Sequence, residues 1–152
     1  MATINPPKTY AEWVAVLDAL KNKKADDETI LAAMQRGSLQ WQSGVAERFS
    51  KKLVEAINTR MNTATDRFQK EMGRAGGQER VLVQSLMALR KEFSFLTKAI
   101  NVPVIPEKDR AQYVRLVLEQ ADSVQNSLED SAKRDRTGKL ASIIRSNKVN
   151  SF

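Results

Sequence analysis

Apolar residues recur every three or four positions along most of this chain, a spacing typical of one face of an α-helix. The longest run covers residues 45–72 and persists for about eight turns. Its apolar positions are Val45, Phe49, Leu53, Ile57, Met61, Ala64, Phe68 and Met72. The pattern predicts a long helix, which the glycine-rich segment 73–78 would end.

Two further runs of this kind predict long helices at about 79–101 and 107–132. In the first, the apolar positions step alternately by four and three residues, which is heptad spacing: Leu82, Leu86, Leu89, Phe93, Leu96 and Ile100. In the second, the predicted seam is Val114, Leu118, Ala121, Val124, Leu128 and Ala132. Pro103 and Pro106 separate the two helices, and Pro106 is placed to open the second.

The N-terminal part of the chain predicts two shorter helices. Thr9 can cap the first, with Glu12 three residues later to complete a capping box. Asp26 or Asp27 can cap the second, and Gly37 is placed to end it. Each helix would turn its apolar face inward.

These elements predict an all-α fold, a helical bundle of three long helices with two shorter N-terminal helices packed across one end. Amphipathic helices joined by short connections cover their apolar stripes against one another. We expect residues 1–132 to form a single helical domain, since the chain is long enough to bury one core. We expect residues 133–152 to form a basic C-terminal tail, docked on that domain or on a partner.

The formal charge of +7 is concentrated in this tail. Residues 133–152 hold six basic residues and one acidic residue, a net charge of +5, whereas the other 132 residues hold nineteen basic and seventeen acidic residues. A basic tail on a nearly neutral body indicates an anionic partner. That partner is nucleic acid, an acidic protein surface, or the acidic helix of the chain itself.

The residue types present argue against an enzyme. The chain has no histidine and no cysteine, which excludes the usual catalytic triads, thiolate sites and histidine-based zinc sites. Neither GxxxxGK[ST] nor GxGxxG occurs. We therefore expect no catalytic residue, no cofactor, no metal site and no small-molecule substrate.

The chain also lacks the sequence signals of membrane insertion and secretion. No apolar run approaches the roughly 20 residues that span a bilayer. The segment "MATINPPKTY" has neither the basic nor the apolar region of a secretory signal. We expect a cytoplasmic protein without a membrane partner, and the absence of cysteine fits a reducing compartment.

Basic residues line the outer face of the helix predicted at 45–72. Arg60, Arg67 and Arg74 repeat every seven residues, which places them on one stripe two turns apart. Such a stripe can follow a phosphate backbone. The alternative is a solvated face with local ion pairs, such as Asp66 with Lys70. Our candidate nucleic-acid contacts are Lys52, Arg60, Arg67, Lys70, Arg74, Arg134, Arg136, Lys139, Arg145 and Lys148.

The tail carries apolar residues that a free arm would not need. Three hypotheses stay open: an arm on a phosphate backbone, docking within the chain, or docking on another subunit. Ordering a tail costs about 1–2 kcal/mol per residue in backbone entropy, so an ordered tail must be held by contacts. Our candidate partner-binding residues are Trp13, Trp41, Leu140, Ile143, Ile144 and Phe152.

Together these patterns favour a non-enzymatic helical accessory or structural subunit of an intracellular complex. It would contact nucleic acid through its basic face and tail, and a protein partner through its apolar positions. The alternative is a protein–protein interaction module, an adaptor or a homo-oligomer, with no nucleic-acid role.

Overall fold

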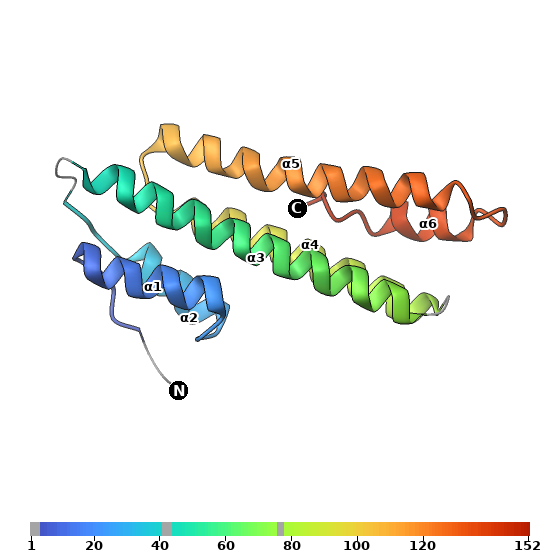
Figure 1. The fold of residues 1–152 in the computed structure, drawn as a ribbon, viewed down its shortest axis with the longest axis horizontal. Helices are drawn as coiled ribbons and strands as arrows, with labels where there is room; N and C mark the ends of the chain where they lie inside the picture. The colour runs from blue at the N-terminus through green and yellow to red at the C-terminus, as the bar shows by residue number, and fades with distance from the viewer. Residues whose placement is uncertain (1–3, 41–43, 76–77) are drawn as a thin grey trace. The chain divides into compact units, whose positions relative to one another are not determined.

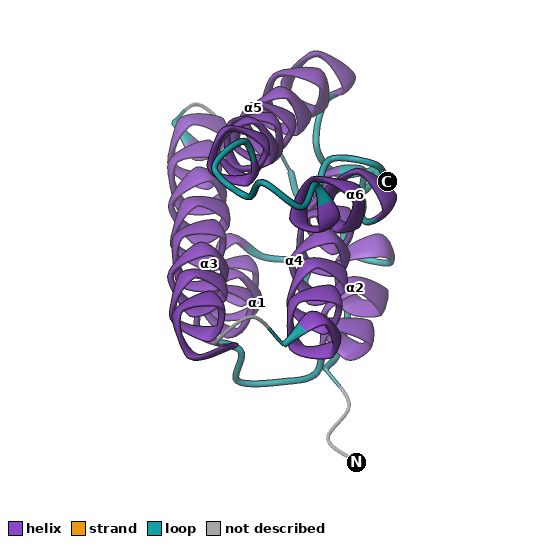
Figure 2. Ribbon diagram, turned by 90° about the vertical axis from the view of Figure 1, so that its right-hand side faces the viewer, coloured by secondary structure: helices purple, strands orange, loops and turns teal. Residues whose placement is uncertain are grey.

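The computed structural model describes residues 4–40, 44–75 and 78–152. In these residues every regular element is a helix, and no strand occurs (Figures 1 and 2). The helices are α1 (Tyr10–Asn22), α2 (Asp27–Gln35), α3 (Val45–Ala75), α4 (Glu79–Ile100), α5 (Glu107–Ala132) and α6 (Lys139–Ser146).

The predicted all-helical fold with three long helices is confirmed. The clearest difference lies at the end of α3, which continues through Gly73 to Ala75 instead of ending at residue 72. A single glycine in a helix costs only about 1 kcal/mol relative to alanine, so it need not end a long amphipathic helix.

The chain divides into two compact units. Unit 1 comprises Met1–Arg60 and Thr97–Tyr113, and unit 2 comprises Met61–Leu96 and Val114–Phe152. The three long helices each contribute to both units, because the boundaries fall within α3, α4 and α5. The single domain expected for residues 1–132 stays a prediction.

In unit 1, both short helices begin at the expected caps. The Thr9 hydroxyl accepts a hydrogen bond from the Glu12 amide at 3.2 Å and donates one to the Glu12 carboxylate at 3.1 Å. Asp26 caps α2 by accepting from the Thr29 amide at 3.1 Å. These contacts satisfy amides that have no partner within the helix, so the capping is local in sequence.

The core of unit 1 is built around Trp13, which is fully buried. Its ring meets Phe49 edge to face, with ring centroids 5.3 Å apart and planes at 87°. Its indole nitrogen donates to the carbonyl of Ser38 at 2.8 Å. Because Ser38 in turn donates its amide to the Pro7 carbonyl at 2.9 Å, the indole joins α1, the segment before it and the segment after α2.

In unit 2, α4 buries the predicted heptad positions Leu82, Leu86, Leu89, Phe93 and Leu96. The seam predicted for α5 is shifted. Leu118 is 40% exposed, whereas Val117, Ala121 and Gln125 are buried at steps of four residues. The glutamine concealed this seam in the sequence, because a polar residue interrupts the apolar spacing.

The tail packs within unit 2 through α6 and the residues after it (Figure 1). Ile144 and Val149 are buried. The Val149 amide donates to the buried side-chain oxygen of Gln125 at 3.1 Å, and the Asn150 side chain donates to Asp122 at 2.9 Å. These two bonds connect the end of the chain to the middle of α5.

Candidate nucleic-acid interface

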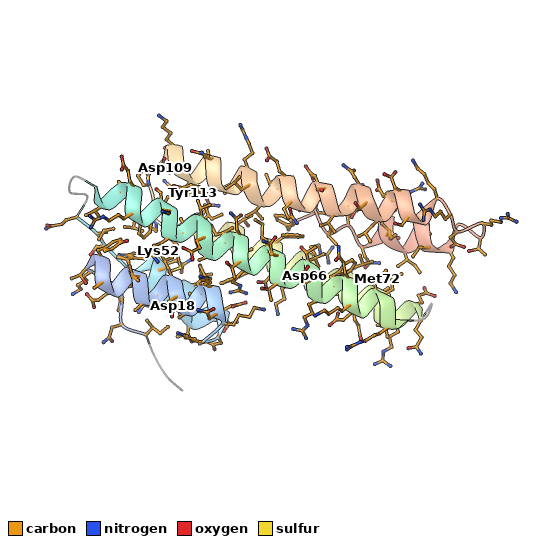
Figure 3. All side chains as sticks on the ribbon, viewed as in Figure 1. Asp18, Lys52, Asp66, Met72, Asp109 and Tyr113 are labelled. Atoms are coloured by element: carbon orange, nitrogen blue, oxygen red, sulfur yellow. The ribbon has the colours of Figure 1, made fainter. Side chains whose placement is uncertain are left out.

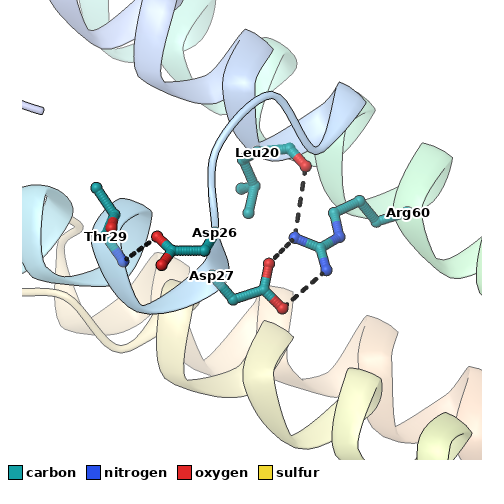
Figure 4. Close-up of polar contacts among 5 residues, drawn as sticks. All are labelled: Leu20, Asp26, Asp27, Thr29 and Arg60. Atoms are coloured by element: carbon teal, nitrogen blue, oxygen red, sulfur yellow. Dashed lines mark hydrogen bonds and ion pairs between the residues drawn. The ribbon is translucent and has the colours of Figure 1, made fainter. Parts of the chain in front are cut away.

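Arg60 does not lie on an exposed basic stripe, so its prediction as a nucleic-acid contact is wrong. Its side chain is buried, and its guanidinium donates to both carboxylate oxygens of Asp27, at 3.0 Å and 3.3 Å (Figure 4). It also reaches the Leu20 carbonyl at 3.5 Å. The two-pronged contact joins α3 to the first residue of α2, so Arg60 is structural.

Two predicted partner anchors are also wrong. Trp13 and Ile144 are buried within this chain, which leaves no side-chain surface for a partner. Leu140 and Ile143 are half-buried. Phe152 is 43% exposed and stacks on Phe93 of its own unit, with ring centroids 6.3 Å apart. Trp41 lies outside the described residues.

Lys52 lies in unit 1, beside a groove of about 280 Å³ between α1 and α3. Figure 3 labels Lys52 and Asp18, which line this groove from the two helices. Lys21 and Glu55, also at the groove, form an ion pair at 2.7 Å. Lys52 therefore shares its surroundings with two carboxylates.

The charges at this groove are not arranged for proton transfer. The hydrogen bond and ion pair between Lys21 and Glu55 raise the pKa of the lysine and lower the pKa of the glutamate. The hydrogen bond from Lys24 likewise lowers the pKa of Asp18. General acid–base catalysis needs groups that titrate near the working pH, and each of these shifts moves a group away from neutrality.

The other predicted contacts lie in unit 2, and most gather at one end of it. This basic end comprises residues 67–75 and 78–80, where α3 finishes and α4 starts, and residues 129–139, where α5 finishes and α6 starts. Lys139 of α6 pairs with Glu79 of α4 at 3.2 Å, which brings the two segments together. Figures 1 and 2 show these helix ends on the same side of unit 2.

The basic end contains eight basic and five acidic residues, a net charge of +3. Its acids are already engaged within the chain. Glu71 pairs with Arg67 at 3.2 Å, Glu79 with Lys139 and Asp130 with Lys133. Glu129 accepts from Gln125 at 3.2 Å, and Asp135 accepts from backbone amides.

Five cations at the basic end are exposed, and across the described ranges none makes an ion pair. They are Lys70, Arg74, Arg80, Arg134 and Arg136. Four of the five are arginines, whose planar fork of donors matches two phosphate oxygens at once. The basic end can therefore bind an anion without first breaking an internal ion pair.

Asp135 fixes the turn that carries two of these arginines. Its carboxylate accepts from the Leu140 amide at 3.0 Å, the Thr137 amide at 3.2 Å and the Thr137 hydroxyl at 2.9 Å. The bond from Leu140, followed by those from Thr137, lowers the pKa of Asp135. Gly138 supports the turn with a φ of 72°, a conformation that favours glycine. Arg134 and Arg136 flank this carboxylate and stay exposed.

Comparison with protein-family models, curated proteins and solved structures gives no match. No described helix is both long and apolar enough to span a bilayer. Within residues 4–40, 44–75 and 78–152, no three metal-ligating side chains cluster to hold an ion.

Arg145 and Lys148 are exposed on α6 and just after it, and Arg67 and Lys139 are engaged with acids. Arg80 and Asp135 are absent from the contacts predicted from sequence. Arg80 follows Arg74 by six residues, beyond the glycine-rich segment predicted to end the helix. A signal for Asp135 was present, since Asp followed two residues later by Thr and then Gly is a turn pattern.

Proposed function

We propose that this chain is a non-enzymatic helical accessory or structural subunit that binds nucleic acid through the basic end of unit 2. One observation carries the proposal: five exposed cations, from the end of α3, the start of α4 and the turn after α5, make no ion pair in the described chain, while Glu71, Glu79, Asp130 and Asp135 are engaged. Such a surface attracts a polyanion, because each phosphate contact releases counterions into solution.

The proposed contact set differs from the one expected from sequence. Arg60 is removed from the set because its side chain is buried, and Arg80 is added because its side chain is exposed. Lys52 belongs to unit 1 and has Glu55 near it, so we do not place it in the interface. Arg145 and Lys148 can extend the surface along α6.

The test is fluorescence anisotropy with a labelled nucleic acid. The test variant replaces Arg74, Arg80, Arg134 and Arg136 with glutamine. A matched variant replaces four exposed cations of unit 1, namely Lys8, Arg36, Arg48 and Lys51. We expect the first variant to lose at least tenfold in affinity and the second to change by less than threefold. Equal losses in both variants would mean that only total charge matters.

A second candidate function is a protein–protein module without nucleic acid. Three large apolar side chains favour it, since Met87, Leu118 and Phe152 are between 40% and 48% exposed. Light scattering after size exclusion, with and without nucleic acid, separates the two. The second function is supported if the protein is an oligomer that dissociates when these residues are changed to serine and whose size does not change when nucleic acid is added.

A further inference from the structure

We propose that the basic end of unit 2 binds the phosphate backbone of a nucleic-acid duplex without reading its bases. The inference rests on the proposed function and deepens it by naming the class of ligand. The ligand chemistry is a rigid, regular array of phosphates, which duplex DNA and duplex RNA both present.

Three arginines of the basic end lie on segments that hydrogen bonds or an ion pair hold in place. Arg134 and Arg136 stand on a turn that Asp135 holds with three hydrogen bonds, so they are not on a flexible arm. The ion pair between Lys139 and Glu79 ties this turn to the start of α4, where Arg80 lies. A backbone held in place suits a rigid duplex, because the turn need not be ordered on binding.

Among its described residues, the basic end offers no aromatic surface on which unpaired bases could stack, since its one aromatic residue, Phe68, is buried. Elsewhere in unit 2, Phe93 is buried, and Phe152, which is 43% exposed, stacks on Phe93. Phe95 is half-buried and has contacts of its own. Proteins that bind single strands rely on exposed aromatic platforms, which contribute about 1–3 kcal/mol per base. The basic end therefore favours paired over unpaired nucleic acid.

The same surface is poorly built to recognise base sequence. Base edges are read mainly by a helix or a β-ribbon that enters the major groove. Here Arg134 and Arg136 lie in a turn, Lys70 and Arg74 lie near the end of α3 and Arg80 at the start of α4, so the five cations do not share one helix face. Contacts from such a set to the phosphate backbone fix position but carry no sequence information.

The experiment measures binding of the full chain to labelled duplex DNA, duplex RNA and single-stranded DNA of one length, each in three unrelated base sequences. For duplexes of one kind, we expect the affinities for the three sequences to agree within about threefold. We expect single strands to bind at least tenfold more weakly. Between 50 and 200 mM salt, five contacts predict a log–log slope of about −4.5 for duplex DNA. In the four-arginine variant one cation remains, so the slope should approach about −1.

Tight binding of either duplex supports the inference, and the DNA and RNA arms show which source is preferred. Single strands that bind as well as duplexes would overturn the inference and leave the proposed function standing. A tenfold preference for one duplex sequence would do the same. If none of the probes binds, both the inference and the proposed function are overturned. Circular dichroism of each variant confirms that lost binding is not lost folding.

Discussion

The carboxylate of Asp27 is the partner of a guanidinium that has lost its contact with water, since Arg60 is 1% exposed. Removing the carboxylate takes two hydrogen bonds from this buried guanidinium. Asp27 itself stays partly exposed, with 40% of its side chain accessible. The loss of this carboxylate should therefore destabilise the fold more than the loss of one partner of a surface ion pair would.

We predict that Asp27→Ala lowers the free energy of unfolding by roughly 1–3 kcal/mol, the cost of leaving a buried donor unsatisfied. The control is Glu28→Ala, which removes an acid from the same first turn of α2 but not from Arg60. That variant should lose only about 0.3–1 kcal/mol of helix-dipole interaction. Urea denaturation at pH 7 measures both. Equal effects would show that the ion pair contributes nothing of its own.

A second prediction concerns Gly37, which lies against the Trp13 ring. A Cβ at this position would fall 2.4 Å from Cζ2 and 2.9 Å from Cη2 of the indole. The ring is fully buried and hydrogen-bonded to Ser38, so it has little freedom to move. We expect Gly37→Ala to destabilise the protein by about 1–3 kcal/mol, as overpacking does.

Gly73→Ala is the matched control for this substitution. Gly73 lies within α3, and nothing is within 4 Å of the Cβ it would gain. Alanine there should stabilise the protein by about 0.5–1 kcal/mol, because it restricts the unfolded chain and favours the helix. Thermal unfolding followed by circular dichroism should show that the two substitutions shift the melting temperature in opposite directions. A stabilised Gly37→Ala variant would show that Trp13 can shift.

Sequence predicted well what depends on neighbours in the chain. The three long helices follow from apolar spacing, and the Thr9 and Asp26 caps follow from side chains that reach amides three residues away. Arg60 was predicted poorly because its partner is 33 residues distant. Its position is three residues after Ile57, so the apolar stripe and the basic stripe overlap there.

At the candidate site too, local features were predictable from the sequence and long-range contacts were not. The charge excess of the tail was visible in the sequence, but the approach of Lys139 to Glu79 was not, since 60 positions separate them. The pairs Arg67–Glu71 and Asp130–Lys133 are local, at separations of four and three residues. Only the pairing of Glu79 with Lys139 depends on tertiary structure.

A third prediction tests how the tail is held. Gln125 is buried and accepts the amide of Val149, which is also buried. We expect Gln125→Leu to destabilise the docked tail by about 1–3 kcal/mol, because it leaves that amide unsatisfied. Trypsin should then cut faster after Arg145 and Lys148. Gln69→Leu, on the exposed face of α3, should leave the cleavage rate unchanged. Unaltered cleavage in the Gln125 variant would mean that apolar contacts alone hold the tail.

A fourth prediction concerns pH. The pKa of Asp135 is lowered in the folded chain, chiefly by the Leu140 amide. Its stabilising contribution is therefore fully present above its unfolded pKa of about 3.9 and is lost as the pH falls through the lower folded value. Amide exchange at Leu140 should be slower in the wild type than in Asp135→Asn at pH 5–7, and the difference should shrink below pH 4. A difference that persists in acid would show that the carboxylate charge is not its source.

The last prediction separates geometry from net charge at the basic end. Asp135→Ala and Asp130→Ala each remove one acid, so charge alone predicts tighter binding of a duplex in both. Only Asp135 holds the turn of Arg134 and Arg136, whereas Asp130 pairs with exposed Lys133. We expect Asp135→Ala to weaken duplex binding roughly three- to tenfold, because two arginines must then be ordered on binding. Asp130→Ala should bind at least as tightly as the wild type in the same anisotropy assay. If both variants gain affinity, the turn does not position the arginines, and attraction to the basic end depends on charge alone.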